Sequence, residues 1–499
     1  MLGDLAAGFS AMFVPYNMIL IIIGVALGLV FGSIPGLTAT MAVAICLPIT
    51  FTMDPGSGMA LLMGLYIGGV SGGLIPAILL KLPGTPSSIS STFDGYPMAQ
   101  NGQAGKAFGL AITFSFLGGI LSIAVLILIS PPLADFALRF GPIEYFAITM
   151  FALTLISSLS EGSIVKGMLA GLLGISLAMV GSAPIDAFPR FTFGMDDLNA
   201  GFNLLPALIG LFAVGEILRI SEKKINPMGQ KKLTHKIKGF GFSVAEFFKQ
   251  GWNFLRSAVI GVAVGILPGI GGGTANIIAY ATAKNQSKTP EKFGKGFSDG
   301  VVASESSNNA AVGGALVPLM ALGIPGDTVT AMLLGGLIIH GLQPGPIFFA
   351  QNTDIVYGIF AALIIANIAM MLFLFLGMKF FVRILSIHKH ILLPIIVVLC
   401  AVGAFAENNR LFDVGALLFF GILGYLFIKF KFPIAPVILG FILGPIAETN
   451  LRRGLQHTDE NFLPFFTEPI AMVFWVIAIG SVGFKAWKNY KNKRIAGGV

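Results

Sequence analysis

The sequence predicts an all-α integral membrane protein whose long apolar helices are interrupted inside the bilayer. The 499 residues are 55% hydrophobic and only 11% charged, and the mean hydropathy is +0.88. A soluble domain has about 25% charged residues. Proline-glycine pairs break the apolar runs, at Pro35-Gly36, Pro83-Gly84, Pro268-Gly269 and Pro325-Gly326. Since non-helical backbone is tolerated in hydrocarbon only where protein buries it or it lines a wet cavity, these breaks predict discontinuous helices and re-entrant hairpins around a substrate pathway.

Composition also excludes several classes of protein. At about 20 residues per crossing, the length allows roughly 10 to 14 membrane passages. The net charge of +8 comes from two basic clusters and reports topology, so no nucleic-acid role is expected. Cys46 and Cys400 lie in apolar runs and form neither a disulfide nor a metal framework. The N-terminus has no basic region followed by a cleavage site, and we expect no removable signal peptide.

The two basic clusters predict the orientation of the chain. They lie in the linker 219–256 and in the tail 485–494, and the positive-inside rule places both in the cytoplasm. Residues 1–16 contain no Lys or Arg, which favours an outside N-terminus. The segment 451–465 would then lie outside, and a last helix at 466–484 would return to the cytoplasmic C-terminus.

The second half of the chain repeats motifs of the first half. Gly28-x3-Gly32-x2-Pro35-Gly36 matches Gly261-x3-Gly265-x2-Pro268-Gly269. Gly72-Gly73 before Pro76, followed by Pro83-Gly84, match Gly313-Gly314 before Pro318, followed by Pro325-Gly326. If the first half starts outside and the second half starts inside, the first half crosses the membrane an odd number of times. The two halves then have opposite orientations and form an inverted repeat. The expected divisions are a first repeat at 1–218, the linker at 219–256, a second repeat at 257–450 and a C-terminal part at 451–499.

Small polar residues at the breaks are the candidate substrate site. Helix N-termini suit an anion, and backbone carbonyls suit a small cation. We expect a hairpin tip at Ser306-Ser307-Asn308-Asn309 between short helices at about 298–306 and 310–322, although these residues could instead only pack helices. The candidate substrate-binding residues are Gly84, Thr85, Ser87, Ser88, Gly272, Gly273, Thr274, Ser306, Ser307, Asn308, Asn309, Pro325 and Gly326. The helix-break residues are Pro35, Gly36, Pro83, Pro268 and Gly269.

Two acidic residues in apolar surroundings are candidates for cation coupling. Glu305 could bind Na⁺ or carry a proton, or it could lie at an aqueous mouth. Asp327 could cap the following helix or contribute to a cation site, together with Thr328 and Ser71. No cofactor beyond a coupling ion, Na⁺ or H⁺, is expected.

Enzyme motifs are largely missing. The sequence contains neither GxxxxGK[ST] nor HExxH. Gly69-Val70-Ser71-Gly72 matches the GxSG of rhomboid-type intramembrane proteases, but four residues are weak evidence in a chain with 64 glycines.

Longer motifs resemble one transporter family. GxxxGxxPG in each half, KLPGTPSS (81–88), FDGYPMAQNGQAGKAFG (93–109) and the segment 292–327 together resemble the TctA family, the large membrane subunit of the tripartite tricarboxylate transporters. The resemblance extends from about Gly24 to Glu448. It implies secondary active uptake of a small carboxylate, citrate or a related organic acid, across the bacterial inner membrane by Na⁺ or H⁺ symport. It also implies a small TctB-like membrane subunit and a periplasmic TctC-like solute-binding protein as partners.

The resemblance also implies a mechanism. The segment 306–309 is similar to the substrate-contacting hairpins of elevator-type transporters, in which a transport domain moves past a scaffold domain. The first half lacks the paired asparagines, so two equivalent half-sites are not expected. No arginine lies in either motif region, and recognition would therefore rest on N–H groups, hydroxyls and amides. The alternatives are a passive anion channel, an intramembrane enzyme and a structural scaffold subunit.

Overall fold

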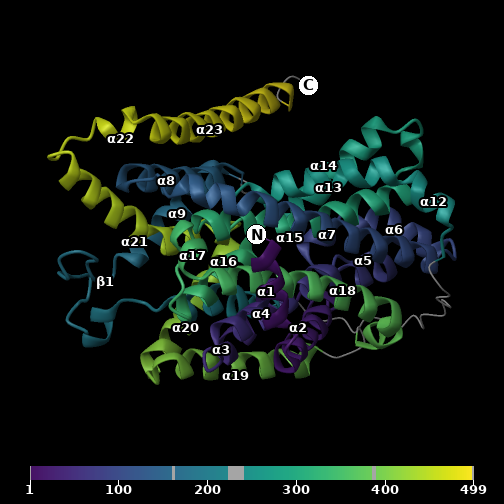
Figure 1. Ribbon diagram of the computed structural model, residues 1–499, viewed down its shortest axis with the longest axis horizontal. Coiled ribbons are helices and arrows are strands. Elements are labelled where there is room, and N and C mark those ends of the chain that lie inside the picture. Colours follow the sequence, from purple (N-terminus) through teal and green to yellow (C-terminus); the bar gives the residue numbers. More distant parts are fainter. Residues whose placement is uncertain (1, 160–162, 223–240, 385–388, 497–499) are drawn as a thin grey trace.

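The computed structural model describes residues 2–159, 163–222, 241–384 and 389–496 (Figure 1). Residues 223–240 of the predicted linker 219–256 lie outside the described residues, as do the side chains of the basic tail. The elements in chain order are α1 (Leu2–Met12), α2 (Pro15–Ser33), α3 (Ala39–Thr50), α4 (Pro55–Gly72), α5 (Leu74–Leu80), η1 (Pro86–Ser88), α6 (Ser91–Gln100), α7 (Ala104–Ala137), α8 (Pro142–Leu159), α9 (Ile164–Ala178), β1 (Gly181–Ser182), β2 (Pro189–Arg190), η2 (Asp196–Ala200), α10 (Leu204–Ile209), η3 (Gly210–Val214), α11 (Gly215–Glu222), α12 (Val244–Lys249), α13 (Gly251–Ile266), α14 (Gly271–Gln286), η4 (Pro290–Lys292), α15 (Ser298–Leu322), α16 (Thr328–Ile339), α17 (Pro346–Gln351), α18 (Thr353–Ile384), α19 (Lys389–Asn408), α20 (Leu411–Lys429), α21 (Ile434–His457), α22 (Pro464–Thr467) and α23 (Pro469–Ala496).

The architecture is that of a helical membrane protein, as predicted. Within the described residues, seven helical segments are long and apolar enough to cross a bilayer. They are Pro15–Ser33, Pro55–Leu80, Ala104–Ala137, Leu204–Glu222, Thr353–Met378, Leu411–Lys429 and Ile434–His457. Shorter apolar helices of 10–17 residues accompany them. The strands β1 and β2 are two residues each and pair antiparallel.

The helices stop at all four predicted breaks. Pro35-Gly36 separates α2 from α3, and Pro268-Gly269 separates α13 from α14. Both glycines have positive φ angles, 97° at Gly36 and 78° at Gly269, which a residue with a side chain rarely adopts. The other two breaks follow α5 and α15.

The predicted hairpin tip at 306–309 is wrong, because α15 runs unbroken from Ser298 to Leu322. The hydroxyl of Ser306 donates to the carbonyl oxygen of Val302 at 2.7 Å, and that of Ser307 donates to Ala303 at 2.9 Å. The helix itself therefore satisfies these polar side chains, and they do not interrupt it.

Glycines bring two pairs of helices into backbone contact, one pair in each half. A Cβ atom at Gly28 of α2 would lie 2.5 Å from the carbonyl oxygen of Leu65 in α4. A Cβ at Gly261 of α13 would overlap the carbonyl oxygen of Ser307 in α15. In each pair a break and a short helix, α3 or α14, separate the two packed helices, and a second break follows the second helix, after the short α5 in the first half.

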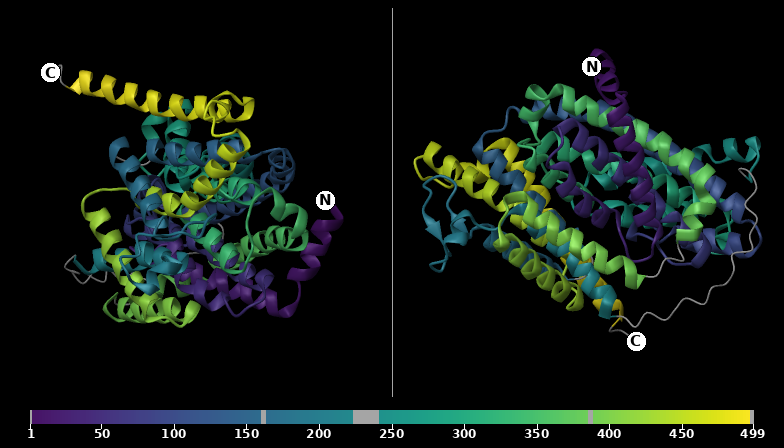
Figure 2. Two further views of the ribbon diagram at one scale, coloured as in Figure 1. Left: turned by 90° about the vertical axis from the view of Figure 1, so that its left-hand side faces the viewer. Right: turned by 90° about the horizontal axis from the view of Figure 1, so that it is seen from below.

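The helices sort into two packed groups. The breaks all belong to the first group, in which α2 packs on α4, α13 and α14 pack on α15, and α7 and α18 cover them. In the second group, α9 packs on α21 and α8, and α20 packs on α10, η3 and α11. Helix α23 lies along one side of the bundle and contacts α8 (Figures 1 and 2).

The contact between α9 and α21 gives a test of the fold. A Cβ atom at Gly174 would overlap the backbone oxygen of Val437, which cannot move away as a side chain can. We expect Gly174→Ala to destabilise the protein by about 1–3 kcal/mol or more. Gly444→Ala is the matched control in the same interface, since its nearest neighbour would lie 3.4 Å away. Thermal unfolding in detergent, followed by size-exclusion chromatography, measures the difference. Equal melting temperatures for the two variants would contradict this packing.

Candidate substrate cavity

A cavity of about 380 Å³ lies where the breaks of the two halves meet. The first break of each half contributes Thr38–Thr40 and Gly269–Thr274, and the second break contributes Thr85–Ser87 and Asp327–Val329. Tyr66, Val70, Ile89, Ile277, Asn308, Ala311 and Val312 complete the wall on the side of the first group. Phe212, Glu216, Ile428 and Ile434 belong to the second group. In the described part of the chain, no Lys, Arg or His lines this space.

Three α-helices begin at the cavity. Their first residues are Ala39 of α3, Gly271 of α14 and Thr328 of α16, and all three line the wall. The first turn of each helix leaves N–H groups without helical partners, and the helix dipole makes this end partly positive. The wall therefore contains partly positive N–H groups without a basic side chain, beside the carboxyl groups of Asp327 and Glu216.

Two of these helix ends are capped and the third is not. Thr38 accepts a hydrogen bond from the Met41 N–H at the start of α3, and Asp327 accepts one from the Thr330 N–H at the start of α16. No side chain caps α14. Its first three residues are glycines, so no Cβ separates its free N–H groups from the cavity. This end of α14 is a ready site for an anion.

Asn308 adds a polar side chain beside the start of α14. The residue is 1% exposed, and neither its amide oxygen nor its amide nitrogen has a hydrogen-bond partner among the described residues. A Cβ atom at Gly272 would lie 3.1 Å from Asn308 Oδ1, which places the amide next to the glycines. An unpaired buried amide is unfavourable. A ligand in the cavity would satisfy it.

Comparison with known protein families identifies the family of the chain. The family described as "Tripartite tricarboxylate transporter TctA family" matches residues 18–439. The chain belongs to the TctA family. This confirms the resemblance found in the sequence and makes the protein a transport component, not an enzyme.

Two relatives from Agrobacterium vitis are similar to this TctA-family chain. The first, described as "Uncharacterized 52.8 kDa protein in TAR-I ttuC' 3'region", is 35% identical over 495 residues, which is 99% of this chain and 98% of the relative. The second, "Uncharacterized protein in TAR-II ttuC' 3'region", is 38% identical over 234 residues, 47% of this chain and 97% of the relative. No solved structure matches the chain.

Asp327 of this TctA-family protein serves as a helix cap, one of the two roles considered for it. Its Oδ1 accepts from the N–H and the hydroxyl of Thr330, at 2.7 and 2.8 Å. Its Oδ2 accepts from the hydroxyl of Tyr66 at 2.8 Å. Thr328, the next residue, lies 3.0 Å from Thr40 through the two hydroxyl oxygens. The two halves are thus joined by hydrogen bonds at the cavity wall.

Glu305 does not lie at an aqueous mouth. It is 0% exposed and is not part of the cavity wall. Its carboxyl oxygens accept hydrogen bonds from Ser91 of α6 at 2.5 Å and from Ser115 of α7 at 2.8 Å. In the described part of the chain it has no ion-pair partner. It is a buried acid held by two hydroxyls, with the Asn308 amide beside it.

Several predicted site residues have packing roles away from the cavity. Asn309 accepts a hydrogen bond from Ser71 at 2.7 Å, which ties α15 to α4 and leaves no free serine nucleophile. Ser88 forms a capping box with Thr85. The other predicted residues also lie outside the cavity wall, where they either allow close contact between the backbones of neighbouring segments or form the breaks. They are Ser306, Ser307, Gly84, Gly326, Pro325, Pro35, Gly36, Pro83 and Pro268. The predicted residues in the wall are Thr85, Ser87, Gly269, Gly272, Gly273, Thr274, Asn308, Asp327 and Thr328.

Sequence reasoning missed Tyr66 and Glu216. Tyr66 follows Leu65, which contacts Gly28, just as Asn308 follows Ser307, which contacts Gly261. When the glycine motifs of the two halves are aligned, Tyr66 of the first half therefore has the position that Asn308 has in the second half. Glu216 hydrogen-bonds Arg219 on α11, and nothing in the breaks indicates that this helix closes the cavity.

Proposed function

We propose that this protein carries a small carboxylate into the cell across the bacterial inner membrane by Na⁺ or H⁺ symport. A periplasmic TctC-like protein would deliver the carboxylate, and a small TctB-like subunit would complete the complex. The observation that carries the proposal is the uncapped start of α14 beside the unpaired Asn308 amide, in a cavity without basic side chains.

In this proposal the carboxylate accepts hydrogen bonds from the N–H groups of Gly271–Gly273 and from Asn308 Nδ2. Hydroxyls of Thr40, Tyr66 and Thr328 lie in the same wall and suit further polar groups of an organic acid. Binding without a bidentate arginine is weaker. Weaker binding favours a carrier, which must release its substrate on the other side.

The coupling ion has candidate sites at Glu305, Asp327, Thr328 and Ser71. Glu305 is the best supported of these, because it is a buried carboxyl group without a cationic partner among the described residues. Such a group is favourable in hydrocarbon only when a proton or a metal ion neutralises it.

We also infer an inverted repeat and an elevator-type movement. All four breaks lie in the first group of helices, whereas Phe212, Glu216, Ile428 and Ile434 of the second group close the cavity. A boundary between a mobile transport domain and a fixed scaffold would run between these walls. In the same proposal the linker and the C-terminus are cytoplasmic and the N-terminus is periplasmic.

The proposed orientation of the chain implies which side of the membrane the cavity faces. Glu216 lies on α11, which runs into the predicted linker 219–256, and Ile428 and Ile434 flank Lys429 and Lys431. The cavity therefore lies toward the basic, proposed cytoplasmic end, as in an inward-facing carrier.

Counterflow in proteoliposomes tests the proposed function. Vesicles that contain the membrane subunits are loaded with unlabelled carboxylate and diluted into labelled carboxylate. A carrier accumulates label transiently without any ion gradient, whereas a passive channel only equilibrates it. The carboxylate is the one identified by mass spectrometry on the purified partner solute-binding protein. Absence of counterflow with that compound would reject the proposal.

A further inference from the structure

A loop outside the cavity exposes several large apolar side chains. This loop, residues 181–203, contains β1, β2 and η2 and connects α9 to α10. Phe193 is 83% exposed, Phe188 66% and Phe191 55%. A single exposed apolar residue is ordinary, but a cluster outside the membrane indicates an interaction site.

The backbone of the loop is held in an uncommon shape. Ala187, Phe191 and Phe193 have φ angles of 53°, 52° and 51°. Non-glycine residues rarely adopt this left-handed region, and bulky residues adopt it least. Phe191 and Phe193, on either side of Thr192, have this backbone shape and exposed side chains.

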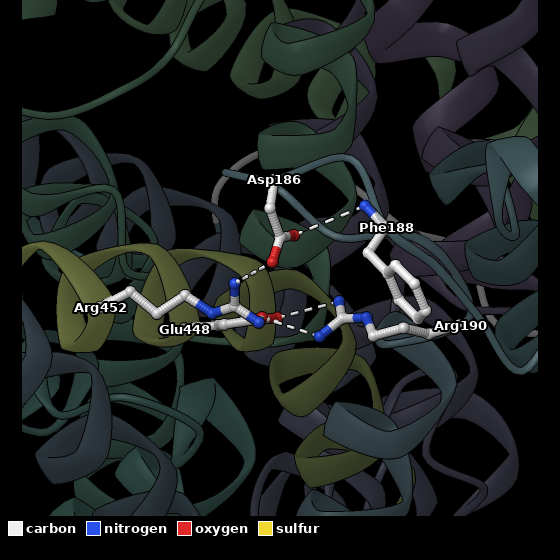
Figure 3. A network of polar contacts seen from close by, with 5 residues as sticks. All are labelled: Asp186, Phe188, Arg190, Glu448 and Arg452. Atoms are coloured by element: carbon white, nitrogen blue, oxygen red, sulfur yellow. Dashed lines mark hydrogen bonds and ion pairs between the residues drawn. The ribbon is translucent and has the colours of Figure 1, made fainter.

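Ion pairs fix the loop to the end of α21 (Figure 3). Arg190 makes a bidentate pair with Glu448 at 2.7 and 3.1 Å, and Arg452 bridges Asp186 and Glu448 at 3.0 Å each. The hydrogen bond from Arg452 lowers the pKa of Asp186. These pairs hold the loop against the end of α21.

The surroundings favour water over lipid. Figure 1 shows β1 projecting from one end of the helix bundle beside α21. The loop contains Asp186, Asp196 and Asp197, and it consists mostly of irregular backbone, which hydrocarbon does not accommodate. It lies at the start of the α10–α11 segment, and the basic linker follows the other end of that segment. In the proposed orientation the loop is therefore periplasmic.

We propose that this loop is the docking site for the soluble solute-binding protein. Phe191 and Phe193 would enter an apolar groove on that protein. Asp186 and Asp197 are paired with Arg452 and Arg410, so Asp196 is the acidic side chain of residues 181–203 left without an ion pair among the described residues. We therefore expect a mainly apolar contact, with a basic residue of the partner facing Asp196. This inference rests on the proposed function, which supplies the partner and the orientation.

The test uses the full-length membrane complex in nanodiscs and the purified solute-binding protein loaded with its carboxylate. We expect Phe193→Ser to weaken their binding by about tenfold or more, as loss of a central aromatic residue does in protein interfaces. Phe248→Ser is the matched control, because Phe248 is 72% exposed on α12, within the predicted linker 219–256. Binding-protein-dependent uptake should fall with Phe193→Ser, while counterflow of free carboxylate stays at the wild-type rate.

The outcomes separate the two proposals. Wild-type binding by Phe193→Ser and by the Phe191→Ser, Phe193→Ser double variant would overturn the docking site. Quenching of a Phe193→Trp variant by brominated lipid would also overturn it, because the loop would then lie in the membrane. Absence of counterflow in the wild-type protein would instead reject the proposed function.

Discussion

Replacement of Asn308 by alanine is expected to slow carboxylate uptake by about 10- to 100-fold. The variant removes an amide that lies beside the Glu305 carboxyl and has no hydrogen-bond partner within bonding distance among the described residues, so it can donate to the substrate. A hydrogen bond to a charged group contributes about 1.5–3 kcal/mol, and each 1.4 kcal/mol changes binding about tenfold. Initial rates in proteoliposomes over a range of carboxylate concentrations measure the effect, which should appear mainly as a higher KM.

Asn309→Ala is the matched control on the next position of α15. Asn309 accepts a hydrogen bond from Ser71 and does not line the cavity. We expect this variant to melt at a lower temperature but to keep the wild-type KM. If Asn308→Ala kept a wild-type KM, or if Asn309→Ala raised it equally, the substrate would not bind at Asn308.

Glu305→Gln should separate substrate exchange from ion-driven accumulation. Glutamine has nearly the same shape and can keep hydrogen bonds with Ser91 and Ser115, but it neither gains a proton nor neutralises Na⁺. We therefore expect counterflow to continue, while uptake driven by an ion gradient falls at least about tenfold. Rates measured with separate pH and Na⁺ gradients identify the ion.

The control for this experiment is Glu291→Gln, an acidic position on η4 that is exposed. It should leave both activities unchanged. Gradient-driven accumulation at the wild-type level in Glu305→Gln, with the same ion dependence, would assign coupling to another site such as Asp327.

The sequence predicted the backbone of the site better than its side chains. Pro-Gly pairs end helices for local reasons, since proline lacks an N–H group and glycine permits positive φ, and all four breaks were found. The tip at 306–309 was wrong because small polar residues suit either a turn or a tightly packed helix. In α15 the contacts with α13 and α7 decide in favour of the helix.

The features of the site that could not be predicted depend on contacts between residues far apart in the sequence. That α14 is the uncapped helix could be read locally from its three glycines, and both Gly272 and Gly273 were predicted as binding residues. By contrast, the partner of Asp327 is Tyr66, which is 261 positions away, and hydrophobic periodicity gives no indication of such a pair. Glu216 joins the cavity only because the second group of helices packs against the first.

The hydrogen bonds between the halves also have a consequence for biosynthesis. Thr40, Tyr66 and Ser71 pair with residues 288, 261 and 238 positions later in the chain. A ribosome adds roughly 5–20 residues per second, so these side chains leave it at least about 10 s before their partners exist. Until then the hydroxyls of the first half can bond only within that half, for example to carbonyl oxygens of their own helix, so the hydrogen bonds that join the two halves form late in the synthesis of the chain.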